Sequence, residues 1–166
     1  CYATGVLQWS WIARGLPFIE QQALYDQMNI ATGSMDLVLP LYATQLPALR
    51  CPSDNSPDEF TDRANLPGGT RYSATSYKGV AGSNWAWGSF AYTPPGGNNN
   101  GLDTGNGFFY RADVAKGNRR FAVVTDGLSN TLMIGEDTPI VNVHSGWVYS
   151  NHATGICAIP LNNALK

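Results

Sequence analysis

Two short apolar runs separated by a polar turn form the clearest hydrophobic pattern along the chain. Residues 121–124 are aromatic, small or β-branched, which favours a strand. Asp126-Gly127 then predicts a tight turn, because Gly accepts positive φ and Asp bonds the local backbone. Residues 132–134 resume an apolar run of strand length, and Gly135 is expected to end it. The polar side chains between the runs are expected to satisfy turn and cap groups: Thr125, Asp126, Ser129, Asn130 and Thr131.

Helical spacing marks the N-terminal part of the chain. Apolar residues recur three and four positions apart, which predicts an amphipathic helix over residues 17–29. Pro17 suits the first helical turn, and Glu20 in that turn complements the helix macrodipole. Asn29 is expected to end this helix. A second, shorter helix is predicted over residues 36–45.

Extended segments and loops account for the rest of the chain. Residues 72–81 read as a strand, in which Gly79 and the following Gly82 indicate a bulge or a close backbone approach. Residues 55–70 and 84–107 are rich in turn-forming residues and are predicted to be loops. Shorter extended pieces are expected at residues 8–12, 108–111, 141–148 and 156–162.

These elements predict an α+β fold with one or two helices packed on an antiparallel sheet and with long loops. Strands follow one another through Gly/Pro turns rather than through regular helices, which argues against a doubly wound parallel sheet. No internal repeat or boundary interrupts the pattern. Residues 1–166 are therefore expected to form a single domain.

Charged residues are scarce. They make up 13% of the 166 residues, about half the usual share, and the net charge is −2. Low-charge surfaces rich in Gly and Asn are common on extracellular β-rich proteins. Basic residues are scattered apart from Arg119-Arg120, so no nucleic-acid partner is expected. No apolar run approaches the ~20 residues of a membrane span. The chain begins at Cys1 rather than Met, so we expect that a segment was cleaved or left out.

Residues that often carry catalysis lack their usual motifs. Ser129 lies in Asp-Gly-Leu-Ser-Asn rather than in the G-x-S-x-G of a nucleophile elbow. His144 and His152 match no zinc signature and no triad motif, and they are expected to be structural. There is no phosphate-binding glycine loop. We therefore expect no enzyme activity.

Two sets of side chains could bind a ligand. Carboxylate oxygens suit calcium, and three acids lie near the central turn, but the EF-hand spacing is absent, so a plain turn is preferred and no cofactor is expected. These calcium candidates are Asp126, Glu136 and Asp137. The second set lies in loop 84–92 and could stack on sugars, anchor a protein partner or simply close the core. It comprises Trp85, Trp87, Phe90 and Tyr92.

The three cysteines form no C-x-x-C motif, which leaves zinc and thioredoxin chemistry without its spacing. In an oxidising compartment, one bridge and one leftover thiol is the simplest arrangement. Lipidation of Cys1, as in a bacterial lipoprotein, and truncation of the chain both account for a cysteine at the first position.

Several short motifs occur in a fixed order along nearly the whole chain. They are Trp9-Ser10-Trp11, Leu16-Pro17-Phe18-Ile19-Glu20-Gln21 with Leu24-Tyr25, Cys51-Pro52-Ser53-Asp54, Thr75-Ser76-Tyr77-x-Gly79-Val80-x-Gly82, Thr125 to Thr131 with Gly135-Glu136, and Ile159-Pro160-Leu161-Asn162. In this order the series resembles the large paralogous family of planctomycete prepilin-like proteins of unknown function. The resemblance implies a type IV pilin or pseudopilin architecture.

The resemblance also implies a function. It is that of a structural pilin- or pseudopilin-like subunit of an extracytoplasmic filament, secretion system or surface assembly, in the periplasm or at the cell surface. Its partners would be other protein subunits, through self-assembly or a larger complex. Family members usually carry an N-terminal apolar helix and a C-terminal His-to-Asp-Gly segment, which this chain lacks, so it resembles the globular head. Membrane contact would come only through the missing helix.

Two alternative functions remain open beside the pilin-like subunit. One is an extracellular carbohydrate- or solute-binding module that uses the aromatic loop 84–92. The other is an accessory subunit of a larger membrane complex. The family has no established catalytic residues to transfer to this sequence.

A disulfide between Cys51 and Cys157 is expected in this setting. Both lie beside family motifs in extended, Pro-flanked segments, whereas Cys1 lies at a terminus that is prone to fray. In the chain-entropy model, a bridge closing so long a loop stabilises by about 4–5 kcal/mol. It requires the two Cα atoms to lie within about 7 Å.

Overall fold

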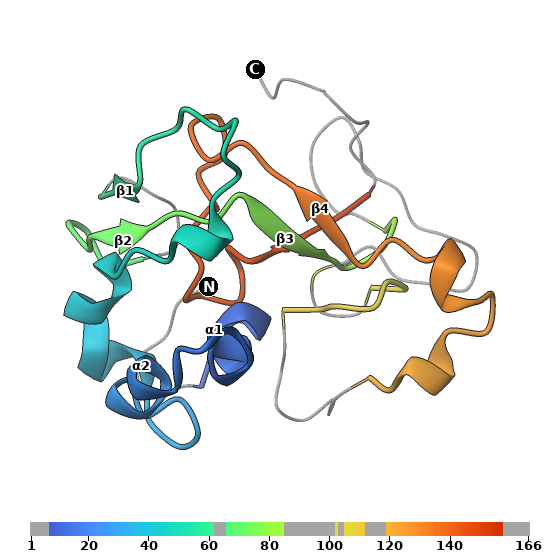
Figure 1. Cartoon of the computed structure of the whole chain (residues 1–166), viewed down its shortest axis with the longest axis horizontal. Helices are drawn as coiled ribbons and strands as arrows, with labels where there is room; N and C mark the ends of the chain where they lie inside the picture. Colours follow the sequence, from blue (N-terminus) through green and yellow to red (C-terminus); the bar gives the residue numbers. More distant parts are fainter. Residues whose placement is uncertain (1–6, 62–65, 85–101, 103–104, 112–118, 158–166) are drawn as a thin grey trace.

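The computed structural model describes residues 7–61, 66–84, 102, 105–111 and 119–157, and this part of the chain contains short helices and two small sheets (Figure 1). The predicted α+β fold is confirmed. No helix among these residues is long and apolar enough to cross a membrane. In order, the elements are α1 (Trp11–Gly15), η1 (Leu16–Ile19), α2 (Gln22–Gln27), η2 (Met35–Ala43), η3 (Pro47–Leu49), β1 (Glu59–Phe60), β2 (Tyr72–Ser73), β3 (Tyr77–Val80), η6 (Phe121–Val123), η7 (Leu128–Asn130), β4 (Ile134–Glu136) and β5 (Thr154–Gly155).

The helix predicted over residues 17–29 is broken into two pieces. Pro17 lies in the first turn of η1 as expected, but Glu20 adopts a left-handed φ of 62° and ends this 3₁₀ helix. α2 follows, and Asn29 with φ 51° comes two residues after its end. The apolar face also differs from the predicted stripe, because Phe18 is 89% exposed while Leu16 is buried.

The other predicted helix forms as a 3₁₀ helix. η2 bends at Val38, where φ is −129°, and contains Pro40. Proline lacks an amide hydrogen and crowds the preceding turn, which disfavours a regular α-helix. Upstream, Trp9 forms a β-bridge with Tyr149, and Ser10 caps α1 by accepting a hydrogen bond from the Ala13 amide at 2.9 Å.

The strands form two separate sheets. β1 pairs antiparallel with β2, and a three-stranded sheet has the order β4-β3-β5. β3 pairs antiparallel with β4 but parallel with β5, so the expectation of a purely antiparallel sheet is wrong for β5. β5 comes from the end of the described chain and lies beside β3 through the Gly79 amide, which donates to Ala153 O at 2.9 Å.

The strand predicted over residues 121–124 is wrong, because Phe121–Val123 form the 3₁₀ helix η6. Phe121 and Val123 are exposed, and no described strand pairs with them, although the Phe121 ring stacks on Phe108 at 5.4 Å. Strand preference of such side chains depends on packing against cross-strand neighbours, and the described residues supply none to this segment. The second strand is confirmed with a shift: β4 begins at Ile134 and contains Gly135 rather than ending there.

Other extended predictions are only partly matched. Residues 108–111 form no strand, although the Phe109 amide donates to Val80 O at 3.0 Å. Residues 141–148 contribute a single bridge, between Ala74 and Gly146. β1 interrupts the predicted loop 55–70. Of the segment 156–162, only the first two residues lie within the described range.

Three tryptophan side chains hold distant segments together. The indole N–H groups of Trp9, Trp11 and Trp147 donate to backbone carbonyls of Gly33, Ala153 and Thr44, at 3.0, 2.7 and 3.0 Å respectively. A buried indole satisfies its donor in this way while its rings contribute a large apolar area. The main core therefore lies between the N-terminal helices and the segment around Trp147.

The predicted close approach at two glycines is confirmed. A Cβ on Gly79 would lie 2.6 Å from the ring of Phe109 and 2.8 Å from Nε1 of Trp11. Gly82 has φ 112°, a conformation that other residues rarely adopt. Both glycines therefore allow later segments to pack directly against β3 and the backbone that follows it.

Candidate functional site

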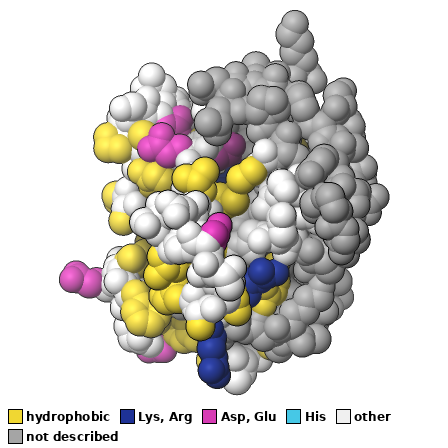
Figure 2. Space-filling model, turned by 90° about the vertical axis from the view of Figure 1, so that its right-hand side faces the viewer, with side chains coloured by type: hydrophobic (Ala, Val, Ile, Leu, Met, Phe, Trp, Pro, Cys, Tyr) yellow, Lys and Arg dark blue, Asp and Glu magenta, His cyan; other side chains and the backbone are white. Residues whose placement is uncertain are grey.

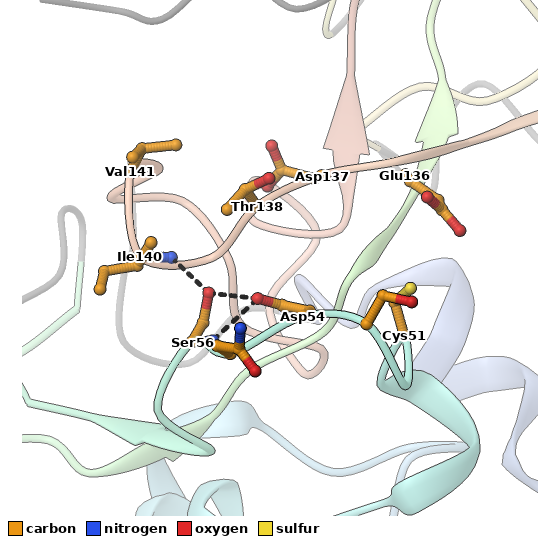
Figure 3. Close-up of a pocket in the computed structure, with 10 residues that line it drawn as sticks. Cys51, Asp54, Ser56, Glu136, Asp137, Thr138, Ile140 and Val141 are labelled. Carbon is orange, nitrogen blue, oxygen red and sulfur yellow. Dashed lines mark hydrogen bonds between the residues drawn. The ribbon is translucent and has the colours of Figure 1, made fainter.

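A polar groove of about 590 Å³ lies between the loop that follows η3 and the loop that follows β4 (Figure 3). Its walls come from two segments that are far apart in the sequence. Seven of its ten lining residues carry hydroxyl, amide or carboxylate groups, and two aliphatic side chains lie at one end. The lining residues are Cys51, Ser53, Asp54, Asn55, Ser56, Glu136, Asp137, Thr138, Ile140 and Val141.

Asp54 organises the first wall of the groove. Its carboxylate accepts hydrogen bonds from the Ser56 amide at 2.9 Å, from the Ser56 hydroxyl at 2.5 Å and from the Ser76 hydroxyl at 2.9 Å. Arg50 Nη2 lies 3.4 Å from its Oδ2. Burial raises the pKa of Asp54, but these hydrogen bonds and the Arg50 charge together lower it below its usual value.

Two serines join the walls. The Ser56 hydroxyl donates to Asp54 and accepts from the Ile140 amide at 3.0 Å. The Ser76 carbonyl accepts from the Asp137 amide at 2.8 Å. One hydrogen bond therefore joins the two loops directly, and Ser76, just before β3, links Asp54 to Asp137, so the two walls are fixed relative to each other.

Behind the second wall lies a buried ion pair. Lys78, on β3, places Nζ 3.2 Å from Asp137 Oδ2 and donates to the His144 carbonyl. Asn142 Nδ2 donates to both carboxylate oxygens of Asp137, at 3.1 and 3.0 Å. Burial lowers the pKa of Lys78, while the Asp137 carboxylate opposes that shift.

The two histidines lie together behind this pair. Their rings are 5.4 Å apart, and His152 is fully buried with Tyr72 and Tyr149 against it at 5.5 and 5.2 Å. The Gly146 amide donates to His152 Nδ1 at 3.3 Å. Burial lowers the pKa of His144 to about 4, assisted by the positive charges of Lys78 and Arg111. Both rings therefore pack as structural groups rather than facing the groove.

The predicted turn at the centre of the sequence is present. Gly127 has φ 94°, and the side chains of Asn130 and Thr131 donate to the carbonyls of Asp126 and Gly127, at 2.9 and 3.1 Å. The capping role expected for these polar side chains is confirmed for two of them. Ser129 lies exposed in η7.

The structure does not bring the three calcium candidates together. Asp126 lies in the exposed turn, and Asp137 is occupied by Lys78 and Asn142. Glu136 and Asp137 point in different directions in Figure 3, as neighbours on an extended chain do. Among the residues described, no group of three or more His, Cys, Asp or Glu side chains could hold a metal ion.

The aromatic candidates Trp85, Trp87, Phe90 and Tyr92 lie outside the described residues. Asn84, the residue just before them, is buried.

The predicted disulfide between Cys51 and Cys157 is absent, because both are free cysteines. The Ser76 amide donates to Leu49 O near Cys51, whereas the Cys157 amide donates to Gly82 O. Ser76 and Gly82 flank β3 on opposite sides, so the segments that carry the two cysteines are hydrogen-bonded near different ends of this strand.

The sequence placed Asp54 and Ser76 in family motifs, but it assigned a site role neither to them nor to Lys78. Lys78 is the only charged residue between positions 72 and 81, so a lone charge in a strand pattern was the available signal. The Asp54-Asn55-Ser56 run is typical of a turn in which Asp accepts from the residue two positions on. No local signal indicated that Ser76 would reach Asp54 across 22 positions.

Comparison with known proteins identifies a family. The SBP_bac_10 family model, described as "Protein of unknown function (DUF1559)", matches residues 2–158. No curated protein and no solved structure matches the chain.

Proposed function

We propose that this chain, which belongs to the DUF1559 family of proteins of unknown function, is a structural subunit that assembles with other protein subunits outside the cytoplasm. The observation that carries the proposal is an apolar surface on one segment, residues 121–143. The segment lies largely apart from the core that the N-terminal helices build (Figure 1).

Large apolar side chains are exposed in this segment far more often than elsewhere. Of the eleven large hydrophobic residues that are exposed among the described positions, eight lie between 121 and 143. Figure 2 shows hydrophobic side chains on the described part of the corresponding face, with acidic and basic side chains beside some of them. The eight, here called the apolar belt, are Phe121, Val123, Leu128, Leu132, Ile134, Ile140, Val141 and Val143.

The apolar belt is displayed by an ordered backbone. The turn at Gly127 closes on itself through Asn130 and Thr131, and the Ile140 amide is bonded to Ser56. Local hydrogen bonds therefore hold the segment without burying its side chains. Eight exposed apolar side chains on one segment support an interaction site there, because leaving apolar surface in water is unfavourable.

The resemblance to prepilin-like proteins supports the same function. Pilin-like heads act as subunits, and the low charge of this chain suits an extracytoplasmic surface. More specifically, we propose a pilin- or pseudopilin-like role in a filament, secretion system or surface assembly. An accessory subunit of a membrane complex would use the same belt. The proposal assigns no catalytic activity, since Asp54 and Lys78 are both engaged in structural contacts.

Site-specific photo-crosslinking tests the proposal. A photoreactive amino acid would replace Leu132 in the belt or, as the matched control, Phe18, which is also highly exposed but lies on η1. In cells that naturally produce the protein, we expect discrete crosslinks to a protein subunit from position 132 and none from position 18. Equal crosslinking from both positions, or none from either, would contradict an interface at the belt.

A second candidate function rests on the groove. Its volume of about 590 Å³ and its hydroxyl and carboxylate lining suit a small polar solute. Glycan-array and solute thermal-shift screens of the wild-type protein and of Asp54→Ala would test it. A solute that stabilises only the wild-type protein would favour this function, and silence across both screens would count against it.

A further inference from the structure

Among the described residues, no strand pairs with the outer edge of β4. In the sheet order β4-β3-β5, β4 is the terminal strand, and all three of its residues are exposed. The Val80 amide donates to Met133 O and the Asp137 amide donates to Ser76 O, both at 2.8 Å. Along an antiparallel strand, the N–H and C=O groups of successive residues alternately face the partner strand and point away from it. The backbone groups of Ile134 and Glu136 therefore point away from β3.

These outward groups are available for another chain. Within the described part of the protein, the structure gives the backbone N–H and C=O of Ile134 and Glu136 no hydrogen-bond partner. An edge of this kind is a template for an added strand, and proteins commonly blunt it with Pro or Lys. Residues 131–138 contain neither.

The side chains on this edge define what the added strand would carry. Leu132, Ile134 and Glu136 alternate along the chain, so they share one face. Directly opposed residues on neighbouring strands approach within about 5 Å on the same face. Apolar residues would therefore lie opposite Leu132 and Ile134, which are 74% and 47% exposed. A different residue would lie opposite Glu136.

The charge near Glu136 favours a basic residue at that position. Glu136 makes no ion pair within the described chain. Of the three carboxylates that line the adjoining groove, Asp54 lies 3.4 Å from Arg50 and Asp137 lies 3.2 Å from Lys78, so Glu136 is the one without a cation among the described residues. Opposite charges facing each other across a sheet stabilise the pairing, whereas like charges weaken it.

We propose that the β4 edge binds an extended segment of a partner protein that pairs antiparallel with it. The segment reads basic–x–apolar–x–apolar, with its basic residue opposite Glu136 and its apolar residues opposite Ile134 and Leu132. Antiparallel pairing is chosen because it is slightly more stable per residue than parallel pairing. This inference deepens the proposed assembly function and rests on it. A second copy of β4 fits less well, since it offers no basic residue to Glu136.

Selection from a displayed library of random heptapeptides tests the inference. The baits are the wild-type protein, Ile134→Pro, Glu136→Lys and the conservative control Ile134→Val. Proline at 134 removes an outward amide hydrogen while sparing the inward bonds to β3. We expect wild type and Ile134→Val to enrich basic–x–apolar–x–apolar peptides and Ile134→Pro to bind them about tenfold more weakly, having lost a backbone bond. Glu136→Lys should enrich an acidic residue at the first position.

Several results would overturn the inference. They are no enriched motif, a motif without a basic residue, binding that Ile134→Pro leaves unchanged, or a motif that Glu136→Lys does not alter. An enriched motif of reversed order would contradict antiparallel pairing. Concentration-dependent dimerisation abolished by Ile134→Pro would make the occupant a second copy. If Ile134→Pro unfolds, the Glu136→Lys arm still decides. The edge inference and the assembly function can also be separated. If no peptide motif is enriched but the crosslinks from position 132 persist in the Glu136→Lys variant, the edge inference is wrong and the assembly function still holds.

Discussion

One apolar segment of this protein is buried and another is exposed. Trp147, Val148 and Tyr149 are almost completely buried, whereas the belt residues between 121 and 143 are exposed. The buried segment lies against the N-terminal helices and forms a bridge to Trp9. The belt finds no such layer within the described chain. Apolar composition alone therefore does not say which segment builds the core; available partners decide it.

Polar groups show why each segment is stable where it lies. In the core, Ser10 donates to Trp147 O and the Trp147 indole donates to Thr44 O, so buried backbone groups are satisfied. In the belt, the turn at Gly127 satisfies its backbone by itself. A segment whose backbone is satisfied locally can leave its side chains outside, which prepares it for a partner.

The largest expected loss of stability comes from a substitution in the buried segment, in contrast to the belt. Trp147→Ala should lower the free energy of unfolding by about 3–5 kcal/mol, because it leaves a large cavity and an unpaired Thr44 carbonyl. Urea unfolding followed by circular dichroism would measure it. A loss below about 1 kcal/mol would show that this segment is not the core on which the comparison depends.

Breaking the ion pair between Lys78 and Asp137 tests whether the groove region contributes to the stability of the fold as the core does. Lys78→Met should cost about 2–3 kcal/mol, because Asp137 is left partly buried without its cation. The double variant Lys78→Met/Asp137→Asn should recover part of that loss, since both charges are then gone. Urea midpoints of the two single variants and the double variant give the coupling, and strict additivity would contradict a stabilising pair.

Acid should weaken the core through His144. A folded pKa of about 4, below the ordinary 6.5, means that folding favours the neutral ring. Above pH 6.5 the ring is neutral in both the folded and the unfolded chain, and the contribution of His144 to stability is fully present. As the pH falls from 6.5 through 4, the unfolded chain takes up the proton first, and this contribution is lost. Because the ring is partly exposed, the effect is on the order of 1 kcal/mol. Urea titrations should show a smaller loss between pH 7 and 4 for His144→Gln; equal losses would contradict the shift.

The smallest effect on stability is expected in the belt itself. Leu132→Ser should change the free energy of unfolding by less than about 0.5 kcal/mol, since the side chain is 74% exposed. The same change should reduce crosslinking to a partner from a reporter at position 141. A stability loss similar to that of Trp147→Ala would place Leu132 in the core and remove the contrast.

The sequence allowed the fold class and several local features to be predicted. Pro17 at a helix start, the turn at Gly127 and the close approach at Gly79 follow from backbone chemistry that a few residues determine. The strand at 121–124 and the face of Phe18 could not be predicted in this way, because burial depends on segments distant in the sequence.

The candidate site was harder to predict than the fold. Asp54 and Ser76 lie 22 positions apart, and Ser56 reaches Ile140 across 84 positions. The disulfide predicted between Cys51 and Cys157 is absent from the structure for a similar reason, since the segments that carry these cysteines are bonded near different ends of β3. All three cases depend on how segments distant in the sequence are placed against one another, and no local residue pattern encodes that placement.

Hydrogen exchange at the β4 edge tests most directly whether the belt is an interface. In the isolated chain, the outward amides of Ile134 and Glu136 should exchange fast, while the inward amides of Gly135 and Asp137 should be protected. In the assembly isolated from cells, the outward amides should become protected as well. Exchange of Ile134 and Glu136 that stays fast in the assembly would contradict a partner bound at this edge.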